Sequence, residues 1–91
     1  MRPITIYTAL QRNGMPCPYC RRAVALLTRK GLVFTEIDLT GKPEERMKLA
    51  VKASGATTVP QVFIGGEYVG DCDELQVLEA RGRLNTLVAV Q

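Results

Sequence analysis

Cys17-Pro18-Tyr19-Cys20 is the stretch that decides the fold of this 91-residue chain. It follows the short apolar run Ile4-Thr5-Ile6-Tyr7 and opens a segment with helical periodicity. A Cys-x-x-Cys at a junction between a strand and a helix is typical of a redox-active dithiol. If Cys17 is the N-cap of the helix, Pro18 falls at the first helical position, where its missing N–H costs nothing.

The predicted position of Cys17 favours its ionised form. Unpaired backbone N–H groups of the first helical turn point toward an N-cap sulfur, and the helix dipole adds positive potential there. Cysteines in such positions have pKa values lowered from about 8.5 to roughly 3.5–7.5. We therefore expect an exposed thiolate at Cys17 that attacks disulfides.

Cys20 is expected to be buried and protonated. It shares one helical face with Ala23, Val24 and Leu27, at the i, i+3, i+4, i+7 spacing of a core-facing stripe. An exposed thiolate beside a buried thiol is the arrangement of an attacking and a resolving cysteine. The alternatives are a structural disulfide and half of a zinc site. Zinc usually takes four Cys or His ligands, whereas this chain has no His and one further Cys, Cys72.

Length and composition indicate one domain spanning residues 1–91, large enough to bury a modest core. Three cysteines do not make a disulfide framework. The sequence offers neither the apolar stretch of a signal peptide nor a membrane-length run, so we expect a cytoplasmic protein that binds no membrane. The net charge of +3 comes without a basic cluster interleaved with aromatics, which argues against nucleic acid as a partner and suits small anions or acidic protein surfaces.

Alternation of apolar residues and turn signals predict four strands and four helices. In chain order these are strand 4–8, loop 9–16, helix 18–30, strand 33–39, a helix from Pro43 to Gly55, strand 59–64, strand 67–69, a helix from Asp71 to Gly82 and helix 84–90. The first strands and helix predict a right-handed βαβ unit with parallel strands. Gly65-Gly66 predicts a hairpin turn, and Asp71 with Glu74 predicts a capping box. The predicted inner face of the second helix consists of Met47, Ala50 and Val51.

Three short motifs in this order, Cys17-Pro18-Tyr19-Cys20, Thr58-Val59-Pro60 and Gly70-Asp71-Cys72-Asp73, together resemble the glutaredoxin family, in its short bacterial dithiol form. The resemblance covers the chain from Ile4 to about Leu84. It implies an α/β, thioredoxin-like fold with a four-stranded mixed sheet flanked by three to four helices. It also implies a monomeric oxidoreductase of cell redox homeostasis and electron transport. Such an enzyme reduces protein disulfides and glutathionylated proteins with glutathione as co-substrate, and no metal is expected.

The resemblance also implies roles for individual residues. Cys17 would be the nucleophile that accepts the glutathionyl group, Cys20 the resolving thiol and Pro60 a cis-proline. Glutathione would be bound by Tyr19, Thr58, Val59, Pro60, Cys72, Asp73 and Arg12. Within this set the backbone of Val59 would pair with the cysteine of glutathione, and Cys72 with Asp73 would bind its γ-glutamyl end. The amides of a helix start are an independent reason to expect an anion there, although an acidic residue such as Asp73 also stabilises a first turn by itself.

The chain departs from the family pattern in three places. The segment 9–16 is longer than usual and has Arg12 instead of a lysine as its only cation. Ala56-Thr57 bring no charge where a cation is common. Asp71 replaces the second glycine of a Gly-Gly pair, which adds a carboxylate near the site unless capping occupies it. All three changes concern the affinity for the glycine end of glutathione. The sequence assigns no role to the long loop 9–16.

Several alternatives stay open at this point. Arg21 and Arg22 either supply positive potential to Cys17 or are a solvated surface pair. Cys72 is either a small helix-start residue or a third chemical participant. Two other functions compete with the main one: a carrier of a [2Fe–2S] cluster, against which the stiff Pro18 argues, and a thioredoxin-like electron donor to one enzyme such as ribonucleotide reductase.

Overall fold

The computed structural model of the protein describes residues 1–89, so Val90, the predicted last residue of the final helix, lies outside the described residues. The elements are β1 (Ile4–Thr8), α1 (Pro18–Arg29), β2 (Thr35–Asp38), α2 (Pro43–Lys52), β3 (Gln61–Ile64), β4 (Glu67–Gly70), α3 (Cys72–Ala80) and α4 (Leu84–Ala89). All eight predicted elements are present in the predicted order. Within residues 1–89, none of the helices combines the length and apolar character needed to cross a lipid bilayer.

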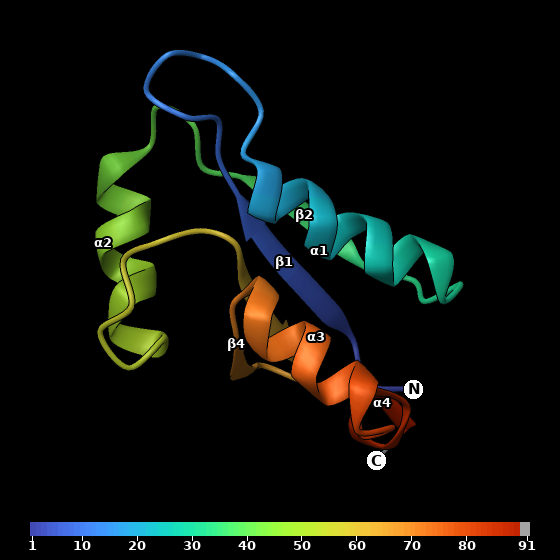
Figure 1. Cartoon of the computed structure of the whole chain (residues 1–91). Helices are drawn as coiled ribbons and strands as arrows, with labels where there is room; N and C mark the ends of the chain where they lie inside the picture. Colours follow the sequence, from blue (N-terminus) through green and yellow to red (C-terminus); the bar gives the residue numbers. More distant parts are fainter. Residues whose placement is uncertain (90–91) are drawn as a thin grey trace.

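The four strands form one mixed sheet in the order β2-β1-β3-β4 (Figure 1). β1 pairs with β2 in parallel, and α1 connects the two, as the βαβ prediction required. β3 lies antiparallel to both β1 and β4. Gly65 and Gly66 turn the chain between β3 and β4, and both have positive φ angles, +61° and +84°, as a two-residue hairpin of the primed type demands. The sheet confirms the thioredoxin-like α/β fold.

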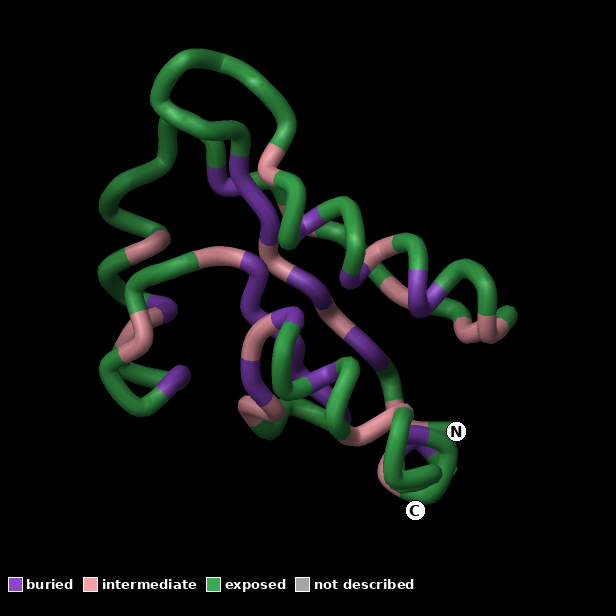
Figure 2. The backbone as a smooth tube through the Cα atoms, in the orientation of Figure 1, coloured by how far each residue is buried: buried purple, intermediate pink, exposed green. Residues whose placement is uncertain are grey.

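The main core lies between the sheet and three helices. In β1 the buried Ile4 and Ile6 alternate with half-buried Thr5 and Tyr7, so one face of the strand is fully covered. The helices α1, α3 and α4 cover this face, and in Figure 2 buried residues alternate with half-buried ones along β1. Their buried side chains are Ala23, Leu26, Leu27, Cys72, Leu75, Leu84 and Val88. Each large apolar side chain buried there contributes about 1.5–3 kcal/mol.

A smaller second core lies on the opposite face of the sheet. Leu49 and Ala53, from α2 and its C-terminal end, pack with Leu39 and Phe63. The rings of Tyr7 and Phe63 meet edge to face, with centroids 5.5 Å apart. This core fixes the position of α2 and, with it, the loop that leads to Pro60.

The predicted inner face of α2 is wrong. Met47 is 74% exposed and Val51 84% exposed, whereas Leu49 is the buried residue of the helix and Ala50 is half-buried. A helix of ten residues carries apolar side chains on two sides, and the pattern alone gives more weight to the larger set. The packing partner decides: only the side with Leu49 and Ala53 can reach Phe63 over a sheet face that α2 alone covers.

Element ends differ from the prediction by a few residues. β2 begins at Thr35 rather than at Val33, which is 79% exposed and lies before the sheet pairing. β3 begins at Gln61, because the preceding Pro60 has no N–H to donate to a neighbouring strand. β4 extends to Gly70, and α1 and α2 end at Arg29 and Lys52, before the predicted glycine stops.

Candidate active site

Cys17 is the N-cap of α1, as predicted. Its backbone is extended (φ −79°, ψ 117°), and Pro18 occupies the first helical position. The Sγ of Cys17 accepts a hydrogen bond from the N–H of Cys20 at 3.3 Å. The side chain is half-buried rather than fully exposed. An amide N–H directed at the sulfur stabilises negative charge on it.

Cys20 is 1% exposed and lies among the inward-facing residues of α1. Burial is the main cause that raises the pKa of the Cys20 thiol to about 12, and a hydrogen bond with Cys17 raises it further. Cys20 is therefore protonated at neutral pH. The two sulfurs one helical turn apart differ in environment as an attacking and a resolving thiol should.

Two arginines follow the dithiol, and both have partners. Arg21 forms an ion pair with Glu36 of β2, and the same carboxylate accepts a hydrogen bond from the hydroxyl of Thr8 at 2.8 Å. The guanidinium of Arg22 lies 5.7 Å from the centroid of the Tyr19 ring, within cation–π range. The Tyr19 side chain, 54% exposed, thus stands at the rim of the site with a cation against it.

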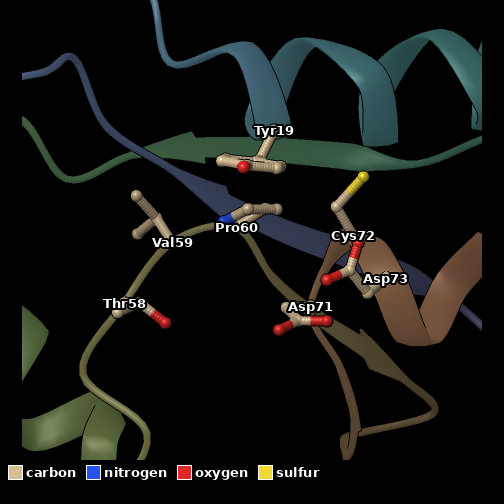
Figure 3. Close-up of a pocket in the computed structure, with 7 residues that line it drawn as sticks. All are labelled: Tyr19, Thr58, Val59, Pro60, Asp71, Cys72 and Asp73. Atoms are coloured by element: carbon tan, nitrogen blue, oxygen red, sulfur yellow. The ribbon is translucent and has the colours of Figure 1, made fainter.

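A cleft of about 280 Å³ lies between Tyr19 of α1, the loop before β3 and the start of α3 (Figure 3). We call it the first cleft, and its lining residues are Tyr19, Thr58, Val59, Pro60, Asp71, Cys72 and Asp73. The Val59–Pro60 peptide bond is cis, as the resemblance implied. Six of the seven residues predicted to bind glutathione thus come together from α1, from the loop before β3 and from the start of α3.

A buried side-chain amide fixes the loop before β3 through hydrogen bonds. Gln61 is 2% exposed, and its Nε2 donates to the carbonyl oxygens of Ala56 at 2.8 Å and Thr58 at 3.0 Å. These bonds fix the loop that presents Val59 and Pro60 to the cleft. The sequence alone gives no sign of this role, because a polar residue in a strand is not expected to be buried.

The start of α3 forms the far wall of the first cleft. Asp71 is the N-cap, and its Oδ1 accepts from the N–H of Glu74 at 3.1 Å, so capping occupies the carboxylate that replaces the second glycine. Gly70 has a φ of +144°, and a Cβ on it would lie 2.5 Å from the Cβ of Glu74, so only glycine fits there. Cys72 is 3% exposed, and burial raises the pKa of its thiol. Asp73 is exposed in the first turn.

A second cleft of about 360 Å³ borders Cys17 and meets the first cleft at Thr58 and Val59. We call it the second cleft, and its lining residues are Ala9, Leu10, Gln11, Arg12, Cys17, Arg46, Thr58 and Val59. Arg12, the remaining predicted binding residue, lies here. Arg46 of α2 joins it and donates from Nη2 to the carbonyl oxygen of Thr57 at 3.0 Å.

Arg46, like Gln61, is a site residue that the sequence did not reveal. The cation was sought in the chain just before Thr58, where Ala56 and Thr57 carry no charge, but the helix packed beside that loop supplies it. A signal was present, because Arg46 lies on the same side of α2 as Leu49 and Ala53. A cation on the inner side of a helix is expected to meet a polar group of the fold.

No set of three or more Cys, Asp or Glu side chains in residues 1–89 is grouped so that it could hold a metal ion. The three cysteines are free thiols. What the site offers chemically is therefore a half-buried sulfur at a helix start, a buried thiol behind it and two clefts that meet at Val59.

These features define a class of protein: a thioredoxin-like α/β domain with a redox dithiol at the start of its first helix. The glutaredoxin family model matches residues 4–69, and this chain belongs to the glutaredoxin family. Family membership supports a redox function centred on the cysteine pair.

Known proteins resemble the chain over most of its length. A glutaredoxin of Pseudomonas aeruginosa is 52% identical over 89 residues, which cover 98% of this chain and 99% of the relative. Glutaredoxin 3 of Escherichia coli is 49% identical over 72 residues, or 79% of this chain and 86% of the relative.

Solved structures agree with the fold. The solution structure of a glutaredoxin from Brucella melitensis superimposes with a TM-score of 0.79 at 46% identity and covers 97% of this chain and 89% of its own. The crystal structure of a buckwheat glutaredoxin–glutathione complex has a TM-score of 0.78 at 26% identity, over 96% of this chain and 76% of that chain.

Proposed function

We propose that the protein is a glutathione-dependent thiol–disulfide oxidoreductase that reduces glutathionylated proteins and protein disulfides. The observation that carries the proposal is the position of Cys17, an N-cap sulfur that accepts an amide hydrogen bond and borders a cleft continuous with the cis-proline loop. A related structure, from buckwheat, contains glutathione, which supports the choice of co-substrate.

Glutathione fits the two clefts in one extended orientation. Its cysteine pairs with the backbone of Val59, which with Thr58 lines both clefts. Its γ-glutamyl end lies at the start of α3, where backbone N–H groups receive the carboxylate and Asp73 receives the ammonium group. Its glycine carboxylate lies toward Arg12 and Arg46 in the second cleft. Arg46 thus supplies the cation that the sequence lacks before Thr58.

The reaction proceeds by thiol–disulfide exchange. The Cys17 thiolate attacks the glutathione sulfur of a mixed disulfide, a Cys17–glutathione disulfide forms, and the substrate protein leaves as a thiolate that takes up a proton. The thiolate of a second glutathione then attacks that disulfide, which releases oxidised glutathione and restores Cys17. With a protein disulfide as substrate, the Cys17 thiolate attacks it and forms a Cys17–protein disulfide, and one protein sulfur leaves as a thiolate. Cys20 then loses its proton and attacks this mixed disulfide, which forms the Cys17–Cys20 bond and releases the reduced protein. Two glutathione molecules in turn reduce the Cys17–Cys20 bond and leave as oxidised glutathione.

The source of electrons tests this proposal. We expect glutathione with glutathione reductase and NADPH to sustain reduction of a glutathionylated peptide, and thioredoxin reductase with NADPH not to do so. Turnover with thioredoxin reductase alone would contradict glutathione dependence and favour the dedicated electron donor. Neither that role nor a cluster carrier has a supporting observation of its own among residues 1–89.

A further inference from the structure

The long loop before Cys17 and the start of α2 enclose a third cleft that the proposed reaction does not use. It has a volume of about 350 Å³ and is lined by residues 9–12, residues 39–43 and Arg46. It shares residues 9–12 and Arg46 with the second cleft, so the two are continuous. A channel therefore leads from Cys17, past the glutathione site, to the start of α2.

The two walls of this third cleft are tied together. The N–H of Leu10 donates to the hydroxyl of Thr40 at 2.8 Å, which joins the loop to the segment between β2 and α2. Thr40 is itself fixed, because its N–H and hydroxyl both donate to Oδ1 of Asp38. Inside the loop, the N–H of Gln11 donates to the carbonyl oxygen of Met15, and the N–H of Gly14 donates to the carbonyl oxygen of Gln11, both at 2.9 Å. The cleft is thus a defined feature of the fold.

The charge around the third cleft has one sign. Arg12, Lys42 and Arg46 line it, and no carboxylate of residues 1–89 lines either it or the second cleft. Within the same residues, neither Arg12 nor Lys42 takes part in an ion pair. Asp38 accepts hydrogen bonds from Thr40, and Glu45 lines a separate groove along α2 that Lys42 also borders. At the start of α2, no side chain caps the first-turn amides.

We propose that this third cleft binds an acidic side chain of the protein being reduced, so that the enzyme prefers glutathionylated proteins with Asp or Glu near the modified cysteine. The inference rests on the proposed function and extends it to a substrate class. The glycine carboxylate of glutathione pairs with Arg12 and Arg46 at the end of the channel near Cys17. Lys42, at the end near the start of α2, binds the carboxylate of the substrate protein. The long loop, which forms the outer wall, thereby acquires a role in the choice of partner.

Two glutathionylated peptides test the proposal. They are identical except that one carries aspartates and the other lysines beside the glutathionylated cysteine. At low salt we expect the wild-type kcat/KM to be about five- to tenfold higher for the aspartate peptide, and the preference to shrink as salt screens the charges. Lys42→Glu should reduce that preference to about twofold or less. Lys52→Glu, which makes the same charge change on the same helix but away from this cleft, should keep it.

The ratio of kcat/KM for the two peptides distinguishes failure of this inference from failure of the proposed function. Equal turnover of both peptides by the wild type, or equal loss of preference in Lys42→Glu and Lys52→Glu, would overturn this inference and leave the proposed function standing. Turnover of neither peptide with glutathione would overturn the proposed function and this inference with it.

Discussion

The division of labour between the two cysteines follows from one helical turn. Cys17 is the cap, with its sulfur at the helix mouth, and Cys20 is the third residue of the helix, with its sulfur in the core. No other group is needed to distinguish them, because a helix start stabilises a thiolate and an apolar core stabilises a thiol.

The different roles of the two cysteines predict that their serine variants lose different activities. Cys17→Ser should abolish both activities, because the other two thiols, Cys20 and Cys72, are buried. Cys20→Ser should keep reduction of a glutathionylated peptide but lose reduction of an intramolecular protein disulfide, since the Cys17–protein disulfide can no longer be resolved internally. Coupled NADPH assays on the two substrates measure both. Turnover by Cys17→Ser would reverse the assignment.

The buried thiol also predicts a pH dependence of stability. The folded pKa of Cys20, about 12, lies above its ordinary value of 9.0, so the folded state holds the proton more tightly than the unfolded chain. The stabilisation is complete below pH 9 and is lost as pH rises from about 9 to 12. Urea unfolding of the reduced protein should show that the free energy of unfolding falls more between pH 8 and pH 11 for the wild type than for Cys20→Ala. Equal falls would mean that Cys20 titrates normally.

Glu36 is expected to restrain the reactivity of Cys17. Its carboxylate pairs with Arg21, and both side chains border a cleft with Cys17. Glu36→Gln would leave the guanidinium unpaired beside the sulfur, so alkylation of Cys17 at pH 6 should become about two- to fivefold faster at low salt. Glu67→Gln in β4, which removes the ion-pair partner of Arg2, is the matched control. No acceleration by Glu36→Gln would show that Arg21 does not act on Cys17.

At the scale of elements, α3 has a structural task and a binding task at the same residues. Its first turn caps itself through Asp71 and, in our proposal, receives the γ-glutamyl end of glutathione. The two tasks coexist because Asp71 accepts from Glu74 and leaves other first-turn amides to a ligand.

Removal of the cap should weaken the fold measurably. Asp71→Ala should lower the free energy of unfolding by about 1 kcal/mol, because the N–H of Glu74 loses its acceptor. Asp71→Ser, which can still cap, should stay within about 0.5 kcal/mol of the wild type. Urea denaturation of the reduced proteins measures both. An Ala variant as stable as the Ser variant would show that the cap contributes nothing.

The elements of the main core could be predicted from sequence, because each carries its own local signal. Pro18 and Gly31 indicate the two ends of α1, Gly65-Gly66 predicts a hairpin turn, and Asp71 predicts the start of α3. The predicted cis bond came from family resemblance alone. What could not be predicted depends on contacts between distant segments: which side of α2 packs, and that Arg46 and Gln61 hold the loop before Pro60.

For the whole molecule, two cores of unequal size lie on either face of the sheet, and only α2 covers the smaller one (Figure 1). α2 also supplies Arg46 to the second cleft, and its N-cap residue, Lys42, lines the third. The position of α2 therefore links the smaller core to the clefts, and substitutions at its inner side should affect both stability and binding.

The inner side of α2 can be tested by paired substitutions. Leu49→Ala should cost about 2–4 kcal/mol, because it removes a buried side chain from the smaller core. Val51→Ala, on the exposed side of the same helix, should change stability by no more than about 0.5 kcal/mol. Denaturant unfolding distinguishes them. Comparable costs would mean that α2 packs through the side with Met47 and Val51 after all.

The account depends most directly on the state of the Cys17 sulfur, which alkylation by iodoacetamide can report. In a Cys20→Ser, Cys72→Ser variant only Cys17 reacts, so its rate can be followed from pH 5 to pH 9 beside that of free glutathione. We predict that the Cys17 rate at pH 6 already lies within about tenfold of its plateau, since the thiolate is the reactive form. A Cys17 rate that rises in step with free glutathione, by roughly a hundredfold or more over the same range, would contradict the central claim.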